Sequence, residues 1–165
     1  MWFLQRKVIL TKDNLVKRNW QGCTKCCFCD QEEIIQHLFF DCPFAKVLWR
    51  IVHLPFSLTP PINTTNLFGN RLNGVNQKDK QHIRVGVCAT LWALWHVRNN
   101  FIFNQFSFPS FLQVIPLASH WIRTWSYLLP EEQRQDMDTG CTRLEMVAQA
   151  LYNRFGWSTE RRIEC

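Results

Sequence analysis

Five of the eight cysteines of this 165-residue chain lie within twenty residues of one another, with a histidine among them. Cys26, Cys29, His37 and Cys42 form the spacing Cys-x2-Cys-x7-His-x4-Cys. Thiolate and imidazole are the donors that Zn²⁺ binds in structural sites, usually four in tetrahedral arrangement. Four protein ligands complete this shell and leave no position for a reacting water molecule. The pattern therefore predicts one structural zinc ion rather than a catalytic one.

The spacing alone leaves the register of this pattern open. Cys23 and Cys26 form a second Cys-x2-Cys pair, and Cys27 adds a fifth thiol nearby. In the alternative interpretation the cysteines are small buried apolar residues and His37 is a core histidine. The number and clustering of the donors favour zinc over this alternative.

The residues around the pattern predict short helices that would hold its ligands. Thr11 is a suitable N-cap for a helix over about residues 12–20. Asp30 and the glutamate three positions later have the spacing of a capping box, which predicts a second helix over residues 31–40 that presents the histidine inward. A third helix is expected over residues 43–52, because proline is tolerated at the first helical position. The last cysteine would return from the link between these two helices.

The second half of the chain is predicted to be helical and rich in tryptophan. Residues 55–80 contain three prolines, two glycines and five asparagines without a sustained period, which is typical of a linker. Beyond it, apolar residues recur at helical spacing over residues 83–102, 110–125 and 142–155. Tryptophans at such spacing are more often core residues than a ligand platform.

These patterns together predict a mainly α-helical protein in two parts. We expect a small zinc-stapled helical module at residues 1–54, a linker at 55–80, a Trp-rich helical module at 81–157 and a tail at 158–165. The composition, 47% hydrophobic and 14% aromatic, argues against disorder. The longest apolar run, residues 85–97, is too short to cross a bilayer.

The positive charge of the chain is unevenly distributed. The net charge is +6, and residues 1–30 hold six basic and two acidic side chains. A basic region of this kind suits contact with a polyanion, although a plain solvated surface explains it as well. The opening residues lack the features of a secretory leader. We therefore expect a protein of the nucleus or cytoplasm that is not secreted and does not contact a membrane.

The stretch ILTKDNLVKRNWQGCTKCCFCDQEEIIQHLFFDCPFAKVLWRIV, residues 9–52, closely resembles the zinc-binding domain that follows the polymerase in plant non-LTR (LINE-type) retrotransposon reverse transcriptases. The elements LTKDNL, RNW, CFC and HLFF-x-CPFAK-x-x-W carry the resemblance, and residues 83–157 are moderately similar to the helical region that follows this domain. Members of the family have an apolar lead-in before the step MWF, with which this chain begins, so we expect an N-terminally truncated domain. On the family pattern the ligands are Cys26, Cys29, His37 and Cys42, whereas Cys23 and Cys27 fall where no ligand is required.

The resemblance implies an accessory module that binds RNA or DNA and does not polymerise. Polymerases hold two metal ions with paired carboxylates, and no such cluster is evident: Asp136 and Asp138 fall in a predicted polar link between helices. We therefore do not expect an enzyme. The candidate phosphate contacts, followed by the candidate stacking residues, are Lys12, Lys17, Arg18 and Lys25, then Trp20 and Phe28.

Two other functions fit the same sequence. Zinc could hold a helical platform whose Trp-rich half docks a protein partner, in which case binding would not weaken steeply with salt. The chain could also be a truncated retroelement relic without a selected activity. The spacing of the metal pattern does not distinguish these readings, because each keeps the same four ligands.

Overall fold

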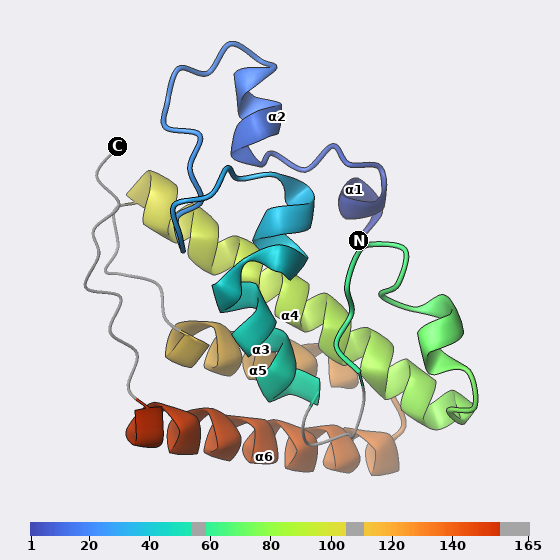
Figure 1. Ribbon diagram of the computed structural model, residues 1–165. Helices are drawn as coiled ribbons and strands as arrows, with labels where there is room; N and C mark the ends of the chain where they lie inside the picture. The colour runs from blue at the N-terminus through green and yellow to red at the C-terminus, as the bar shows by residue number, and fades with distance from the viewer. Residues whose placement is uncertain (54–58, 105–110, 156–165) are drawn as a thin grey trace.

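The computed structural model describes residues 1–53, 59–104 and 111–155, and within them the protein is mainly helical, as predicted. The long helices α4, α5 and α6 lie together, α3 crosses them, and the N-terminal segment lies on the opposite side of α4 from α6 (Figure 1). No strand forms in the described part of the chain, where a single β-bridge joins Lys25 to Glu32. The helical elements, including the π-helical turn η1 and the 3-10 turn η3, are α1 (Trp2–Gln5), α2 (Lys12–Val16), η1 (His37–Asp41), α3 (Pro43–His53), η3 (Gly69–Leu72), α4 (Gln77–Asn104), α5 (Phe111–Ser126) and α6 (Glu131–Phe155).

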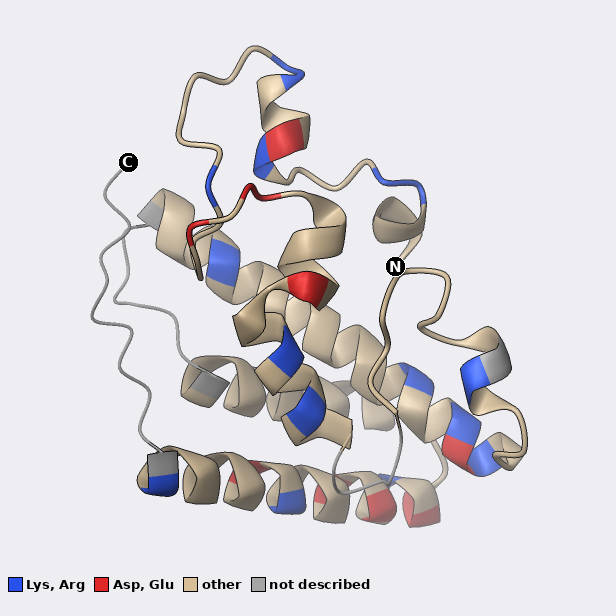
Figure 2. Cartoon of the chain, viewed as in Figure 1, with Lys and Arg blue, Asp and Glu red and all other residues tan. Residues whose placement is uncertain are grey.

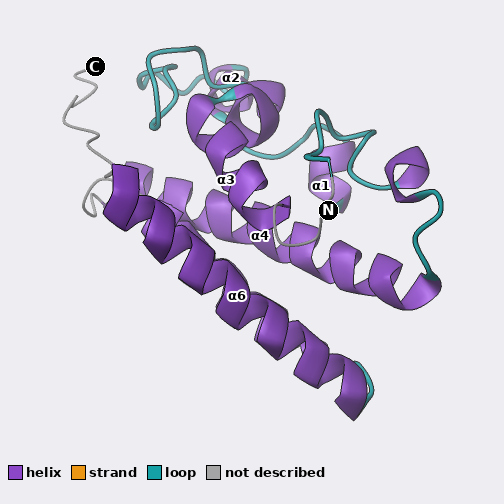
Figure 3. Cartoon of the chain, turned by 60° about the horizontal axis from the view of Figure 1, so that its bottom comes forward, coloured by secondary structure: helices purple, strands orange, loops and turns teal. Residues whose placement is uncertain are grey.

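The three long helices pack in chain order, with α5 against both α4 and α6. Figure 3 shows α6 along its whole length in front of α4. Small residues make this close packing possible: Ala93 of α4, Ala118 of α5 and Ala148 of α6 are all almost completely buried. Val114 and Ile115 of α5 fill the space beside them, each with no exposed surface. The longest apolar run, residues 85–97, is the central part of α4, in agreement with the helical spacing of residues 83–102.

One cluster of buried apolar side chains connects the cysteine-rich segment to the long helices. It includes Phe39 of η1 and Leu48 of α3 together with Leu94 of α4. The ring of Phe39 lies 6.3 Å from that of Trp95, centroid to centroid. Because burial of apolar surface is the main favourable contribution to folding, α4 supports the cysteine-rich segment directly.

Helix α4 begins earlier than its apolar period indicates. Its first residue is Gln77, inside the stretch predicted as a linker, because Asn76 acts as a polar cap: its side-chain oxygen accepts the amide of Asp79 at 2.8 Å. Asparagine is one of the preferred N-cap residues, and capping of this kind needs no apolar partner. A search for hydrophobic periodicity therefore misses the first turn.

Helix α6 corrects a second expectation. It begins at Glu131, eleven residues before the predicted start, so Asp136 and Asp138 lie on a helix rather than in a polar link. Pro130 precedes it, and Glu131 and Glu132 occupy its first turn, where carboxylates interact favourably with the helix dipole. At residue 142, where the apolar period predicted the helix to begin, the hydroxyl of Thr142 donates to the carbonyl of Asp138 within the helix.

The charged side chains are unevenly placed over these elements. Lysine and arginine lie along the segment from α1 to the cysteine-rich loop, and the middle of α4 is free of charge on its visible side (Figure 2). No helix in the described ranges combines the length and apolar character needed to span a membrane.

Candidate metal centre

A tight hairpin positions the first two cysteines. The amide of Cys26 donates to the carbonyl of Gln31 at 2.7 Å, and the amide of Glu33 donates to the carbonyl of Thr24 at 2.9 Å. Together with the bridge between Lys25 and Glu32, these bonds close a loop that turns the sulfurs of Cys26 and Cys29 toward one side. The predicted helix over residues 31–40 is therefore wrong over residues 31–34, which form no helix.

A π-helical turn positions the other two ligands. The amide of Cys42 donates to the carbonyl of His37, five residues earlier, at 2.8 Å. In an α-helix, with 3.6 residues per turn, two side chains five positions apart point to different faces. The π-helical turn is wider, because its hydrogen bond joins residues five apart, and it brings the side chains of His37 and Cys42 to the same side. Pro43 then starts α3, as predicted, and holds Cys42 at the helix N-terminus.

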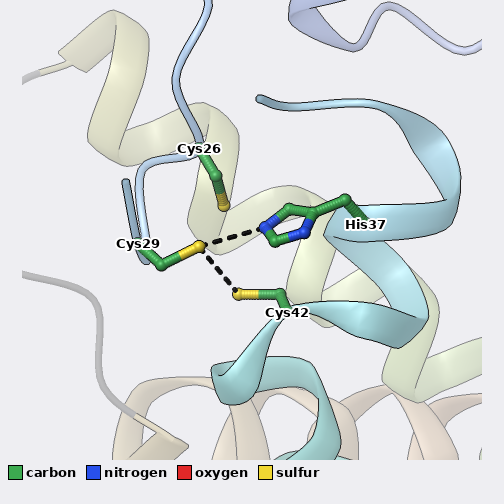
Figure 4. A group of neighbouring side chains, drawn as sticks. All are labelled: Cys26, Cys29, His37 and Cys42. Carbon is green, nitrogen blue, oxygen red and sulfur yellow. Dashed lines mark hydrogen bonds between the residues drawn. The ribbon is translucent and has the colours of Figure 1, made fainter. Parts of the chain in front are cut away.

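The four predicted ligands converge on one point (Figure 4). His37 Nε2 lies 3.0 Å from Cys29 Sγ, which lies 3.8 Å from Cys42 Sγ, and all four donor atoms lie within 4.8 Å of one another. Sulfur ligands of one tetrahedral zinc ion are about 3.8 Å apart, as bonds of about 2.3 Å require. The two donor atoms that lie farthest apart would therefore approach by about 1 Å when zinc binds. Neither Cys23 nor Cys27 belongs to the quartet. The four residues that converge are therefore those that the family pattern implied as ligands.

Backbone amides surround the sulfurs of the quartet. The amide of Phe28 lies 3.5 Å from Cys26 Sγ, and the amides of Gln31 and Phe44 hydrogen-bond to the sulfurs of Cys29 and Cys42 in the same way. In each case the donor is the residue two positions after the cysteine. Such donors stabilise thiolate over thiol, and they hold the ligands in place when a metal is bound.

Crowding of the sulfurs affects their protonation. Hydrogen bonds from Cys27 and Cys42 lower the pKa of Cys26. The pKa of Cys42 is raised, because its thiol donates to Cys26 and because it is buried, and burial also raises the pKa of Cys27 and Cys29. One thiolate therefore forms readily among neighbours that keep their protons. A divalent cation would displace those protons, since it supplies the positive charge that the cluster lacks.

The donor set fits zinc in a structural site. Three sulfurs and one imidazole nitrogen are typical zinc ligands, Cys26 and Cys42 are fully buried, and Cys29 and His37 are half-buried. Four protein donors fill a tetrahedral shell, so the arrangement can hold an ion that fixes the fold. It offers no open position at which a metal-bound water could react.

A buried ion pair beside the quartet was not foreseen from the sequence. Glu33 and Arg98 have no exposed side-chain surface, and Arg98 Nε lies 3.1 and 3.3 Å from the two carboxylate oxygens. Glu33 also accepts the amide of Lys12 at 3.0 Å, and the guanidinium lies 4.8 Å from the ring centroid of Trp95. The assignment of Glu33 to a capping box is therefore wrong. The sequence offered one signal of this ion pair, the position of Arg98 at the end of the apolar run of residues 85–97.

The candidate nucleic-acid contacts differ in accessibility. Lys17, Arg18 and Lys25 are exposed, and Lys17 pairs with Asp13 at 3.4 Å. Lys12 is 6% exposed and its ammonium group donates to the carbonyl of Lys25. The half-buried aromatic residues are Trp20, whose ring covers Gly22, and Phe28, which stacks on Phe44 with centroids 4.2 Å apart.

Comparison with protein families found a match that covers the quartet. Residues 1–49 match the family described as zinc-binding in reverse transcriptase. Searches of curated proteins and of solved structures gave no match. The family match agrees with the predicted resemblance to a reverse-transcriptase zinc-binding domain, and it covers all four residues whose donor atoms converge. The segment that carries the quartet, residues 1–49, is therefore similar to the zinc-binding domain of reverse transcriptases.

Proposed function

We propose that this chain is an accessory module of a plant non-LTR retrotransposon reverse transcriptase, which binds one Zn²⁺ through Cys26, Cys29, His37 and Cys42 and uses the surface around that site to bind RNA or DNA. The convergence of the four donor atoms within 4.8 Å is the observation that supports it most. The module would act in the nucleus or cytoplasm, where such nucleic acids are found.

Zinc in this proposal has a structural role. The hairpin and the π-helical turn are short, and little regular structure supports the loop before them. Metal binding free energy is folding free energy in sites of this size. The ion would hold Lys25, which immediately precedes the first ligand, at a fixed distance from α2 and its exposed cations.

The charges around the site support a polyanionic partner. Lys17, Arg18 and Lys25 are exposed on the segment that leads into the quartet, and Figure 2 shows further basic positions between α1 and α2. Cations that neutralise phosphates release bound counterions, so affinity falls as salt rises. This dependence distinguishes nucleic acid from an apolar protein partner.

The carboxylates of the second half support a role without polymerase activity. Asp136 pairs with Lys78 at 2.8 Å, and Asp138 pairs with Arg123 at 2.6 Å. Carboxylates neutralised by lysine and arginine are poor ligands for the two divalent ions that nucleotidyl transfer needs. We propose that this chain grips template or target and leaves the chemistry to a separate polymerase.

The test combines metal analysis of the purified chain with mobility-shift assays. We expect one zinc per chain and binding to RNA or DNA that weakens strongly between low and physiological salt. A folded chain without metal would refute the zinc site. Binding that is insensitive to salt, or absent, would refute the nucleic-acid role, and salt-insensitive binding to a protein would favour the interaction-module alternative.

A further inference from the structure

An aromatic groove lies between the N-terminal residues and the helices α4 and α5, outside the metal centre. Its cavity volume is about 730 Å³, within the range of about 300–1,000 Å³ typical of ligand sites. Trp92 and Trp95 of α4 and Trp121 and Trp125 of α5 line one wall, and the N-terminal segment, with Phe3, lines the other. The groove therefore joins the family domain to the Trp-rich half.

The tryptophans hold one another in place and still leave a ring accessible. Trp92 is 44% exposed, and its ring contacts Trp121 edge to face at a centroid distance of 6.2 Å. Trp121 in turn lies 5.6 Å from Trp125. Because neighbours restrain these rings, little conformational entropy is lost when a flat ligand stacks on Trp92.

The charge of the groove matches an anionic ligand. Arg18 has the only charged side chain among the described residues that line it. The exposed Arg6 and Lys7 follow α1 on the same segment, and in the part of the chain that the structure describes neither they nor Arg18 form an ion pair. A cation beside an aromatic wall is the combination that binds single-stranded nucleic acid.

One polar group in the wall lacks a partner. The indole N–H of Trp121 is buried and has no hydrogen-bond partner among the described residues. A buried donor without an acceptor is costly and uncommon. This nitrogen has almost no accessible surface, so it belongs to the packed interior of the wall and not to the face that a ligand would contact.

We propose that this groove binds unpaired bases of single-stranded nucleic acid, stacked on Trp92, with the adjacent phosphate at Arg18. The inference rests on the proposed nucleic-acid function and specifies its substrate as single strands. In a duplex both faces of each base are covered by neighbouring bases, whereas in a single strand they are free to stack on aromatic side chains. A duplex would therefore contact Arg18 through its phosphates without stacking on Trp92.

Trp92→Leu tests the stacking directly, because leucine keeps the apolar character of the site and removes the flat ring. We expect the variant to bind a short single-stranded oligouridine about 5- to 150-fold more weakly than the parent, as measured by fluorescence anisotropy. Its affinity for a hairpin duplex of equal length should be unchanged. Trp92→Phe should retain most of the single-strand affinity, since phenylalanine also stacks.

Tyr127→Leu is the matched control, because Tyr127 is an exposed aromatic residue of the same half that does not line the groove. It should bind both probes like the parent. Arg18→Gln is a second variant whose folding is not in question, since its side chain is exposed, and it should reduce the salt slope of single-strand binding by about 0.7. Circular dichroism compares the helix content of all variants.

The outcomes separate the groove from the function on which it rests. If the parent binds nucleic acid and Trp92→Leu binds single strands equally well, or loses duplex binding to the same degree, the groove is not the base site and the proposed function stands. If Tyr127→Leu loses as much single-strand affinity as Trp92→Leu, the groove is likewise not the base site. If the parent binds neither probe, the proposed function and the groove fail together. If the Trp92 and Arg18 variants both bind oligouridine like the parent, the proposal is overturned, and an apolar helix of another protein becomes the favoured occupant of the groove.

Discussion

Arg98→Met removes the guanidinium that neutralises Glu33 and keeps an apolar stem of similar length. In the parent, Arg98 donates to both oxygens of the Glu33 carboxylate and to Asn99 at 2.7 Å. In the variant the carboxylate retains one protein donor, the amide of Lys12. A fully buried negative charge would then have no positive partner.

The expected loss is large on the scale of domain stability. Removing one partner of a buried ion pair costs about 3–5 kcal/mol, because the remaining charge is left in an environment of low polarity. The free energy of unfolding of a whole domain is about 5–15 kcal/mol. We therefore expect a clear shift of the urea midpoint, monitored by circular dichroism with zinc in the buffer.

A double variant separates the buried charge from lost packing. In Glu33→Gln/Arg98→Met the charge is absent, and the glutamine oxygen can still accept the amide of Lys12. It should be more stable than Arg98→Met alone, although it carries one more substitution. Arg143→Met, an exposed arginine on α6, is the matched control and should lie within about 0.5 kcal/mol of the parent. An Arg98→Met variant whose free energy of unfolding lies within about 1 kcal/mol of the parent would refute the reasoning. So would a double variant whose loss of stability equals the sum of the losses in Glu33→Gln and Arg98→Met.

Three further predictions concern the metal, the pH dependence and the nucleic-acid surface. His37→Ala should lose zinc and unfold residues 20–52, because metal binding contributes their folding free energy; retained zinc and unchanged helix content would contradict this. Burial and the neighbouring guanidinium of Arg71 lower the pKa of His53 from 6.5 to about 4. As the pH falls, His53 of the unfolded chain is therefore protonated before His53 of the folded chain. The free energy of unfolding should fall by about 3 kcal/mol between pH 6.5 and pH 4. His53→Gln should remove this part of the pH dependence in urea titrations, and a pH profile identical to that of the parent would argue against it. Charge reversal at Lys17 and Arg18 should reduce the salt slope of RNA binding by about 1.4 or more, and an unchanged slope would exclude both from phosphate contact.

The sequence was sufficient where local chemistry determines the outcome. The spacing of the metal pattern predicted which donor atoms converge, and the family resemblance chose its register. Pro43 marks the first residue of α3 because its missing amide costs nothing there. The central part of α4 followed from its apolar run.

The sequence was insufficient where residues far apart meet. A glutamate three positions after Asp30 is a common helix-start pattern, and nothing local shows that Glu33 pairs with an arginine 65 residues later. The π-helical turn before Cys42 was equally hidden, because its register depends on both ends being held by the site. The early start of α6 was missed because its first turns are polar and show no apolar period.

The pairing of Glu33 with Arg98 has a consequence for cutting the protein into smaller pieces. The segment that matches the family ends at residue 49, whereas the cation that neutralises its buried carboxylate lies on α4. A fragment that stops after α3 would carry an orphaned negative charge, and the apolar side chains of Phe39 and Leu48 would face water instead of the long helices. An expression boundary drawn from the family match alone should therefore yield an aggregating peptide, and the shortest well-behaved piece should extend through α4.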